Sequence, residues 1–453
     1  MQDERGATRA GQRYWLVLLL ALALVRGLIY LAATPPWQAP DEWGHFEHAW
    51  LIAHLGRLPG REDVSPLFER ELMASMYEWQ YDRFFGGPLP EQMPARLHDL
   101  MRRQPRTVLT GRFSLAYAWT ALFILPFKHQ DLIAQLYAAR FASVALNLGI
   151  VGLAWQIFRE LLPKEPRLGA AMTAFIVLLP QHTFINASVN EGPLAELCAC
   201  AALYGWLRLF SRGTDALAII AIALGTVLGV WAKSTAFFLI PLGIVLLALF
   251  LGRNRRLGRA AWLKLASLAL ALVVLVVLVA LQAPVGSRPI ELLHRWWYQT
   301  RFEERSVSLG DTLVSTLDSF WAKFGWMAAR AAPIWYFAVY VLLLVAVEGW
   351  IWPRTRRCSV PGWGKAALGA ALLVAVATWL AFALGRTSSG AYAQGRYLFS
   401  VAAPVAFFVV GGWARWTPER WQPYFAAAAV TTMAVLDATA FCLTLWPFFY
   451  GWQ

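Results

Sequence analysis

The chain has 453 residues, of which 58% are hydrophobic and only 15% are charged. Several apolar runs exceed the roughly 18 residues that a helix needs to cross a bilayer core, and a soluble domain cannot bury so many such helices. The formal net charge of +13 is concentrated in short connectors, which is typical of membrane orientation and argues against nucleic-acid binding. The composition therefore predicts an all-α polytopic membrane protein, with residues 1–453 forming one integral membrane domain.

About eleven apolar segments are predicted to span the membrane. They cover residues 14–34, 132–158, 168–186, 190–210, 214–231, 234–251, 261–282, 333–352, 365–385, 396–414 and 421–446. Residues 113–128 are also apolar, but counting them as a span would place the basic connector at 253–264 outside the membrane. We therefore expect residues 113–128 to form an interfacial or re-entrant helix. The alternating basic connectors predict a cytoplasmic N-terminus and an external C-terminus in a bacterial inner membrane.

Two long segments are expected on the extracytoplasmic side. The first, residues 35–131, is rich in proline and charge and is predicted to form short interfacial helices and loops. The second, residues 283–332, carries aromatic residues together with Arg301 and Arg305. Such a mixture fits either a surface that binds a sugar phosphate or an interfacial anchor. The four cysteines indicate neither a disulfide framework nor a structural metal site.

Residues 40–47 (PDEWGHFE) directly follow the first predicted span. On a helix, Asp41, His45 and His48 would share one face. We expect Asp41 and Glu42 to be catalytic carboxylates, with Asp41 accepting a proton from an attacking hydroxyl and His45 or Glu42 orienting the substrate or its phosphate. Two alternatives stay open. In the first, Asp41 and Glu42 only cap the helix N-terminus and carry solvated loop charge. In the second, Asp41, His45 and His48 hold a divalent cation.

Three other polar positions are predicted at the same membrane face. The turn between the third and fourth spans, residues 186–193, contains Asn186, Asn190 and Glu191. This turn would bind sugar hydroxyls or assist the base; in the alternative, it is only a polar turn in which Asn190 caps the next helix. Lys233 interrupts an apolar stretch between the fifth and sixth spans, and Arg396 begins the tenth. Together these cations can hold a phosphate, although Lys233 would also fit simple snorkelling to the interface.

Two arginines fall inside predicted spans. Arg26 lies in the first span and Arg140 in the second. Because an unpaired charge is costly in a membrane, both are expected to face the protein interior as structural residues, paired with Glu196, Asp437 or polar backbone.

An ordered set of short motifs resembles a known family. The motifs are PDExxHF at 40–46, AARF around Arg140, Pro180-Gln181 ahead of Asn190-Glu191, SFWxxFGW at 319–326 and QGRY at 394–397, the last of which contains Gln394, Arg396 and Tyr397. From about residue 14 to residue 414, the chain resembles a bacterial group of predicted membrane proteins that is placed in the GT-C glycosyltransferase superfamily.

The resemblance implies a GT-C helical bundle with short helices in the first external loop. It implies that a polyprenyl-phosphate sugar is the donor, and that a glycan, lipid or protein of the cell envelope is the acceptor. The acidic catalytic residue of that loop maps to Asp41, with Glu42 adjacent. A second acidic position falls near Glu191, where aspartate is more usual. The resemblance implies no required cofactor, and a divalent cation remains an option.

The residues and the resemblance together predict an inverting glycosyl transfer on the extracytoplasmic face. The donor phosphate would sit between Lys233 and Arg396, with the anomeric carbon facing Asp41. One alternative is a polysaccharide polymerase or ligase that uses lipid-diphosphate glycans and depends on Arg301 or Arg305. The other is a lipid or glycan transporter, which the absence of any internal repeat disfavours.

Overall fold

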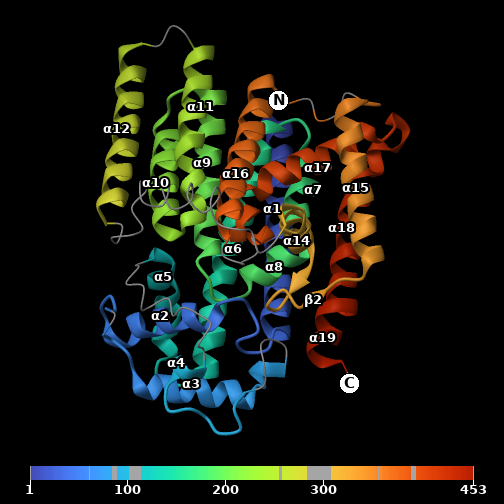
Figure 1. The fold of residues 1–453 in the computed structure, drawn as a ribbon. Coiled ribbons are helices and arrows are strands. Elements are labelled where there is room, and N and C mark those ends of the chain that lie inside the picture. Colours follow the sequence, from blue (N-terminus) through green and yellow to red (C-terminus); the bar gives the residue numbers. More distant parts are fainter. Residues whose placement is uncertain are drawn as a thin grey trace.

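The computed structural model describes residues 2–60, 62–83, 89–100, 114–254, 258–282, 308–355, 358, 360–388 and 394–451. Long apolar helices form one bundle (Figure 1). The helices of the bundle are α1 (Gln2–Ala33), α6 (Leu132–Leu161), α7 (Pro166–Val177), α8 (Pro180–Asn186), α9 (Gly192–Arg212), α10 (Ala216–Ala232), η4 (Ser234–Phe238), α11 (Leu239–Arg253), α12 (Arg259–Gln282), α15 (Pro333–Ile351), α16 (Gly362–Ser388), η5 (Gly395–Val401), α17 (Ala402–Trp416), η6 (Glu419–Tyr424), α18 (Phe425–Ala440), η7 (Phe441–Leu445) and α19 (Trp446–Tyr450).

The chain is a polytopic helical membrane protein, but the expected count of about eleven spans is not reproduced. Within the described residues, eight helices are long and apolar enough to cross a membrane. A ninth arises if α7 and α8, which meet at an angle of 62°, are counted as one broken span. The two remaining expected spans correspond to α10, whose 17 residues are at the lower limit of a membrane crossing, and to α12, which has 24 residues.

A layer of short helices covers one end of the bundle. It contains α2 (Glu42–Leu55), α3 (Pro66–Glu78), η1 (Tyr81–Arg83), α4 (Leu97–Leu100), α5 (Leu115–Ile124) and η3 (Leu125–Phe127). Figure 1 shows this layer at the end opposite the N-terminus, and the C-terminus lies toward the same end as the layer. The apolar helix Leu115–Phe127 is too short to cross a membrane, as expected for residues 113–128.

Local sequence signals explain where the helices of this layer begin. Ser65 accepts a hydrogen bond from the backbone of Phe68, and Pro66 occupies the first turn of α3. Ser114 caps α5 in the same way through the backbone of Ala116. The layer has an aromatic core in which Trp37, Trp43 and Phe46 are completely or almost completely buried. It therefore packs as a folded unit.

A small hairpin departs from the all-α expectation. It follows α14 (Leu309–Trp321) and pairs β1 (Lys323–Phe324) with β2 (Ala329–Arg330) in antiparallel register, Lys323 opposite Arg330. Positive φ values at Gly325 (59°) and Met327 (68°) let the chain reverse between the two strands. The indole of Trp326 in this turn donates to the backbone of Trp37, which ties the hairpin to the first loop.

Arg26 pairs with one of its expected partners. Its guanidinium forms an ion pair with Asp437 of α18 and also donates to Thr183 and to the carbonyl of Val177. Every group involved is buried, so these bonds satisfy a charge that an apolar interior would otherwise exclude. The pair joins the first and last long helices of the bundle.

Candidate functional site

The backbone at Asp41 is held in a rare conformation. Two prolines follow α1, and Asp41 stands at the N-cap position of α2 with φ 62° and ψ 9°. Such left-handed geometry is uncommon for residues other than glycine and persists only where the surrounding structure imposes it. The Asp41 side chain makes no capping hydrogen bond to the helix, so the capping interpretation is wrong for this residue.

The Asp41 carboxylate is instead paired with Arg396. The guanidinium Nη2 of Arg396 lies 2.8 Å from Oδ2 of Asp41, and 51% of the Asp41 side chain remains exposed. Burial raises the pKa of Asp41, but the charge of Arg396 and its hydrogen bond to the carboxylate hold that pKa below its ordinary value. The structure thus joins two residues that are 355 positions apart.

Glu42 has a structural role in place of the catalytic one expected for it. It is fully buried, and both carboxylate oxygens accept hydrogen bonds from Arg140, at 2.8 and 2.7 Å. The backbone N–H of Val189 donates to the same carboxylate. The remaining donors of Arg140 go to carbonyls at the end of α1. Because its side chain is fully buried and both of its oxygens accept hydrogen bonds within the protein, Glu42 is placed as the partner of Arg140 and does not face solvent.

His45 and His48 pack on either side of one tyrosine. His45 Nδ1 lies 2.9 Å from the hydroxyl of Tyr117, and the His48 ring stacks on Tyr117 with centroids 4.3 Å apart. Burial lowers the pKa of His45, and it lowers the pKa of His48 to about 4 despite the nearby charge of Glu191. Both rings are therefore neutral at pH 7.

The cation interpretation of this face finds no support in the geometry. Across the described part of the chain, no group of three His, Cys, Asp or Glu side chains is arranged to hold a metal ion. The neutral His45 and His48 rings serve instead as packing and hydrogen-bonding partners of Tyr117.

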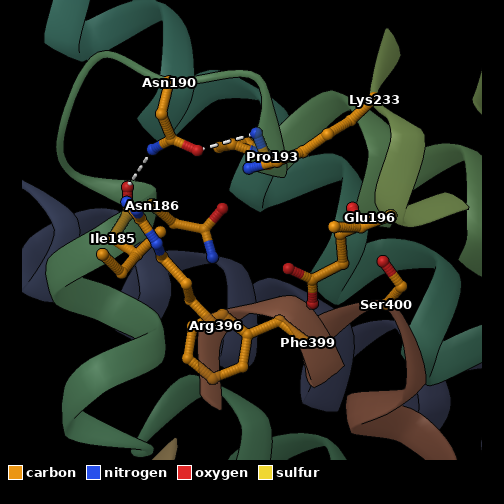
Figure 2. Close-up of a pocket in the computed structure, with 11 residues that line it drawn as sticks. Ile185, Asn186, Asn190, Pro193, Glu196, Lys233, Arg396, Phe399 and Ser400 are labelled. Carbon is orange, nitrogen blue, oxygen red and sulfur yellow. Dashed lines mark hydrogen bonds between the residues drawn. The ribbon is translucent and has the colours of Figure 1, made fainter. Parts of the chain in front are cut away.

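Lys233 and Arg396 flank the ring of Tyr397. The Lys233 ammonium lies 5.8 Å from the ring centroid, and the Arg396 guanidinium carbon lies 5.6 Å from it. Lys233 stands at the break between α10 and η4 and lines the same pocket as Arg396 (Figure 2). Burial, followed by repulsion from Arg396, lowers the pKa of Lys233. Since Lys233 points into the pocket, the snorkelling alternative does not describe it.

The QGRY motif places Arg396 by close backbone packing. Gly395 lies so near α14 that an added Cβ would come within 2.2 Å of the Phe320 nitrogen. Its own N–H donates to the Ser319 hydroxyl at 2.8 Å. Gln394 precedes η5 and accepts the Tyr397 N–H through its carbonyl, but its side chain does not line the pocket.

The turn before α9 carries the other predicted polar residues. The Asn190 side chain bridges the turn, donating to the carbonyl of Ile185 and accepting the N–H of Gly192 at 2.7 Å. It shapes the turn, as its structural alternative predicts, and it also lines the pocket. Glu191 acts electrostatically on His45, His48 and Lys233, which places its carboxylate among them.

One pocket collects residues from α8, α9, η4 and η5. Its empty space is about 320 Å³, including the part open to solvent. The residues that line it are Ile185, Asn186, Asn190, Gly192, Pro193, Glu196, Lys233, Thr235, Arg396, Phe399 and Ser400. Arg301 lies outside the described residues.

Sequence analysis included Asn186 in the turn at 186–193 but did not assign Glu196 or Ser400 to the site. Glu196 was expected only as an ion-pair partner for an arginine, yet it lines the pocket beside Lys233 and Arg396. A carboxylate within an otherwise apolar run was the signal that could have identified it.

Comparison with known families agrees with this architecture. The family described as "Predicted membrane protein (DUF2142)" matches residues 24–405. The chain belongs to this family. The matched range contains every site residue described above, from Asp41 to Ser400. No curated protein matches the chain. Membership of the family supports a multi-pass membrane protein.

Proposed function

We propose that this protein is a glycosyltransferase of the GT-C type. It moves a sugar from a polyprenyl-phosphate donor to an acceptor hydroxyl in cell-envelope glycan assembly. The observation that carries the proposal is the pairing of Asp41 with Arg396, which lines a pocket together with Lys233. A half-exposed carboxylate beside two cations has the parts that displacement of a phosphate by a hydroxyl requires.

The proposed reaction is an inverting displacement. The acceptor oxygen attacks the anomeric carbon, the bond from that carbon to the phosphate oxygen breaks, and the acceptor proton passes to Asp41. Lys233 and Arg396 bind the lipid phosphate and stabilise the charge that it gains as it leaves. A positioned base typically contributes ~10²–10⁴-fold to such a rate.

Donor binding would activate Asp41. Arg396 holds the pKa of Asp41 below its ordinary value, and a base with a low pKa accepts a proton poorly. A donor phosphate competes for the guanidinium and draws it away from the carboxylate. The pKa of Asp41 then rises, so the base becomes effective when the donor is in place.

The distribution of positive charge supports an extracytoplasmic site. α6, α9 and α11 run away from the layer of short helices (Figure 1) and end in basic residues, Arg159, Arg212 and Arg253. Basic residues mark the cytoplasmic end of membrane helices. The pocket and Asp41 would then face the outside of a bacterial inner membrane. Reporter fusions that are active only outside the membrane should be active at residue 58 and inactive at residue 254, and the reverse pattern would refute this orientation.

A transporter is the second candidate, favoured by one feature. The 62° bend between α7 and α8 resembles the broken helices that line transport pathways. Uptake of a lipid or glycan by proteoliposomes, without any product formed, would support the transporter. The polymerase alternative depends on Arg301 and Arg305, which lie outside the described residues.

Asp41→Asn tests the mechanism. Asparagine tolerates left-handed backbone geometry better than most residues, so the variant should fold while lacking the base. Purified protein in liposomes would receive a panel of polyprenyl-phosphate sugars, and the release of sugar to acceptor or water would be measured. We expect the wild type to consume at least one donor and the variant to lose roughly 10²–10⁴-fold of that rate.

Asp63→Asn is the matched control. Asp63 belongs to the same external layer and pairs with Arg57 at the surface, so its loss should leave turnover unchanged. An Asp41→Asn protein that folds and turns over at the wild-type rate would eliminate Asp41 as the base. Donor consumption by neither protein would count against the proposed reaction class.

A further inference from the structure

The floor of the pocket contains a buried amide with an unused acceptor. Asn186 is 2% exposed, and its Nδ2 donates to the carbonyl of His182 at 3.0 Å. That bond fixes the orientation of the amide and leaves Oδ1 without a partner among the described residues. A buried acceptor left unpaired destabilises the folded protein, so an empty acceptor in a pocket indicates a missing donor.

Glu196 presents a second acceptor to the same space. Its side chain is 3% exposed, and the one hydrogen bond that it makes within the described chain comes from His182 Nε2 at 2.8 Å. The His182 ring is itself fully buried and packs against Phe399. Figure 2 shows the side chains of Asn186 and Glu196 pointing into the pocket, with Ser400 beside them. The carboxylate thus has an oxygen free to accept from a ligand.

The chemistry of this floor determines what it can bind. Both Asn186 Oδ1 and the Glu196 carboxylate accept hydrogen bonds, so their ligand must donate them. The negative charge of Glu196 repels phosphate and carboxylate. A group with several hydroxyl donors satisfies both acceptors. The cations Lys233 and Arg396 line the same pocket and suit the phosphate of such a molecule.

We propose that Asn186 and Glu196 form a hydroxyl-binding subsite that recognises the sugar of the donor. The inference rests on the proposed function and deepens it, because it separates the pocket into a phosphate-binding part and a sugar-binding part. His182 positions the Glu196 carboxylate. Sugars with free hydroxyls at the subsite bind, and deoxy or O-methyl analogues bind roughly 10- to 100-fold more weakly, as expected for loss of a hydrogen bond to a charged group.

The test compares binding of lipids with and without a sugar. The full-length protein in detergent is titrated with a short-chain prenyl phosphate and with the same lipid carrying hexoses or pentoses. We expect the wild type to bind at least one glycosylated lipid more tightly than the bare lipid. In Glu196→Gln and in Asn186→Ala, the preference for the glycosylated lipid over the bare lipid should decrease roughly 10- to 100-fold. The affinity for the bare lipid should be retained.

Glu160→Gln serves as the control, since Glu160 pairs with Arg212 at the far ends of α6 and α9. Retained binding of the bare lipid shows that each variant is folded, and Asn186→Ala provides the test if Glu196→Gln fails to fold. If sugar-dependent binding survives in both variants, or if no sugar improves wild-type binding, the subsite is refuted and the proposed function stands. If neither lipid binds the wild type, the proposed function fails, and the subsite fails with it.

Discussion

Burial determines the protonation of the residues beside Asp41. His48 is 2% exposed, and burial lowers its pKa from 6.5 to about 4. A buried neutral histidine takes up a proton more readily in the unfolded chain than in the folded one. The neutral His48 ring therefore contributes fully to the free energy of unfolding above pH 6.5, and this contribution is lost as the pH falls toward 4.

We expect the wild type to lose about 3 kcal/mol between pH 6.5 and pH 4 through His48 alone. His48→Phe retains the stacking on Tyr117 but removes the titrating group, so its stability should fall less steeply over this range. Thermal unfolding in detergent at a series of pH values measures the difference. Parallel pH profiles for the two proteins would show that His48 does not titrate in this way.

At the scale of the elements, close packing between η5 and α14 positions Arg396, the proposed phosphate-binding cation. Gly395 approaches the Phe320 backbone so closely that a methyl group has no space. The neighbouring Arg396 is 8% exposed in its side chain and reaches Asp41 from this anchored start of η5. Displacement of η5 should therefore weaken the Asp41–Arg396 pair as well as the fold.

Gly395→Ala should lower the stability by about 1–3 kcal/mol, as overpacking typically does. It should also weaken binding of a prenyl phosphate, because Arg396 moves with η5. Gly152→Ala in α6 is the matched control, since an added Cβ there meets nothing within 4 Å. Thermal unfolding and lipid titration check both effects. Equal stability and affinity for the two variants would contradict the role given to this contact.

The bend between α7 and α8 shows what a span prediction from hydropathy alone omits. Residues 168–186 were predicted as one span, yet α7 ends at Val177 and α8 begins at Pro180. Proline lacks an N–H and disfavours helical geometry in the preceding residue, so Pro180 was a usable signal for a break. The angle of 62° between α7 and α8, in contrast, depends on how the two helices pack against other helices.

In the whole molecule, one buried ion pair attaches the external layer to the bundle. Glu42 begins α2 and Arg140 lies within α6, and both side chains are completely buried. Asp41 precedes Glu42, so the same pair also positions the proposed base. Adjacent carboxylates thus have different environments, since Asp41 is half-exposed beside Arg396 and Glu42 is buried in the interior.

Glu42→Gln should cost about 3–5 kcal/mol, because it leaves the Arg140 charge buried without its partner. Glu160→Gln at the opposite end should cost much less, since the Arg212 side chain with which it pairs is 50% exposed. Unfolding midpoints of the two variants measure the contrast. A Glu42→Gln protein of wild-type stability that has lost activity would return Glu42 to the catalytic role.

Much of the architecture was predictable from the sequence because membrane helices are local structures. Every backbone bond of such a helix is made within the segment, so long apolar runs such as 132–158 and 396–414 specified α6 and α17 without knowledge of their neighbours. The polar motifs that contain Asp41, Lys233 and Arg396 were likewise recognisable as interruptions of apolar sequence. Their common membrane face followed from their positions at the ends of spans.

Only the tertiary structure decided which of these residues meet. Sequence spacing could not distinguish Asp41 from Glu42, because the Arg140 that buries Glu42 comes from another helix. Sequence spacing also could not show that Glu196 and Asn186 line the same pocket as Lys233, because this pocket is formed where α8, α9 and the break between α10 and η4 meet. The sequence determined the helices and the chemical groups at their ends, and long-range packing determined which groups are paired and which remain free for a substrate.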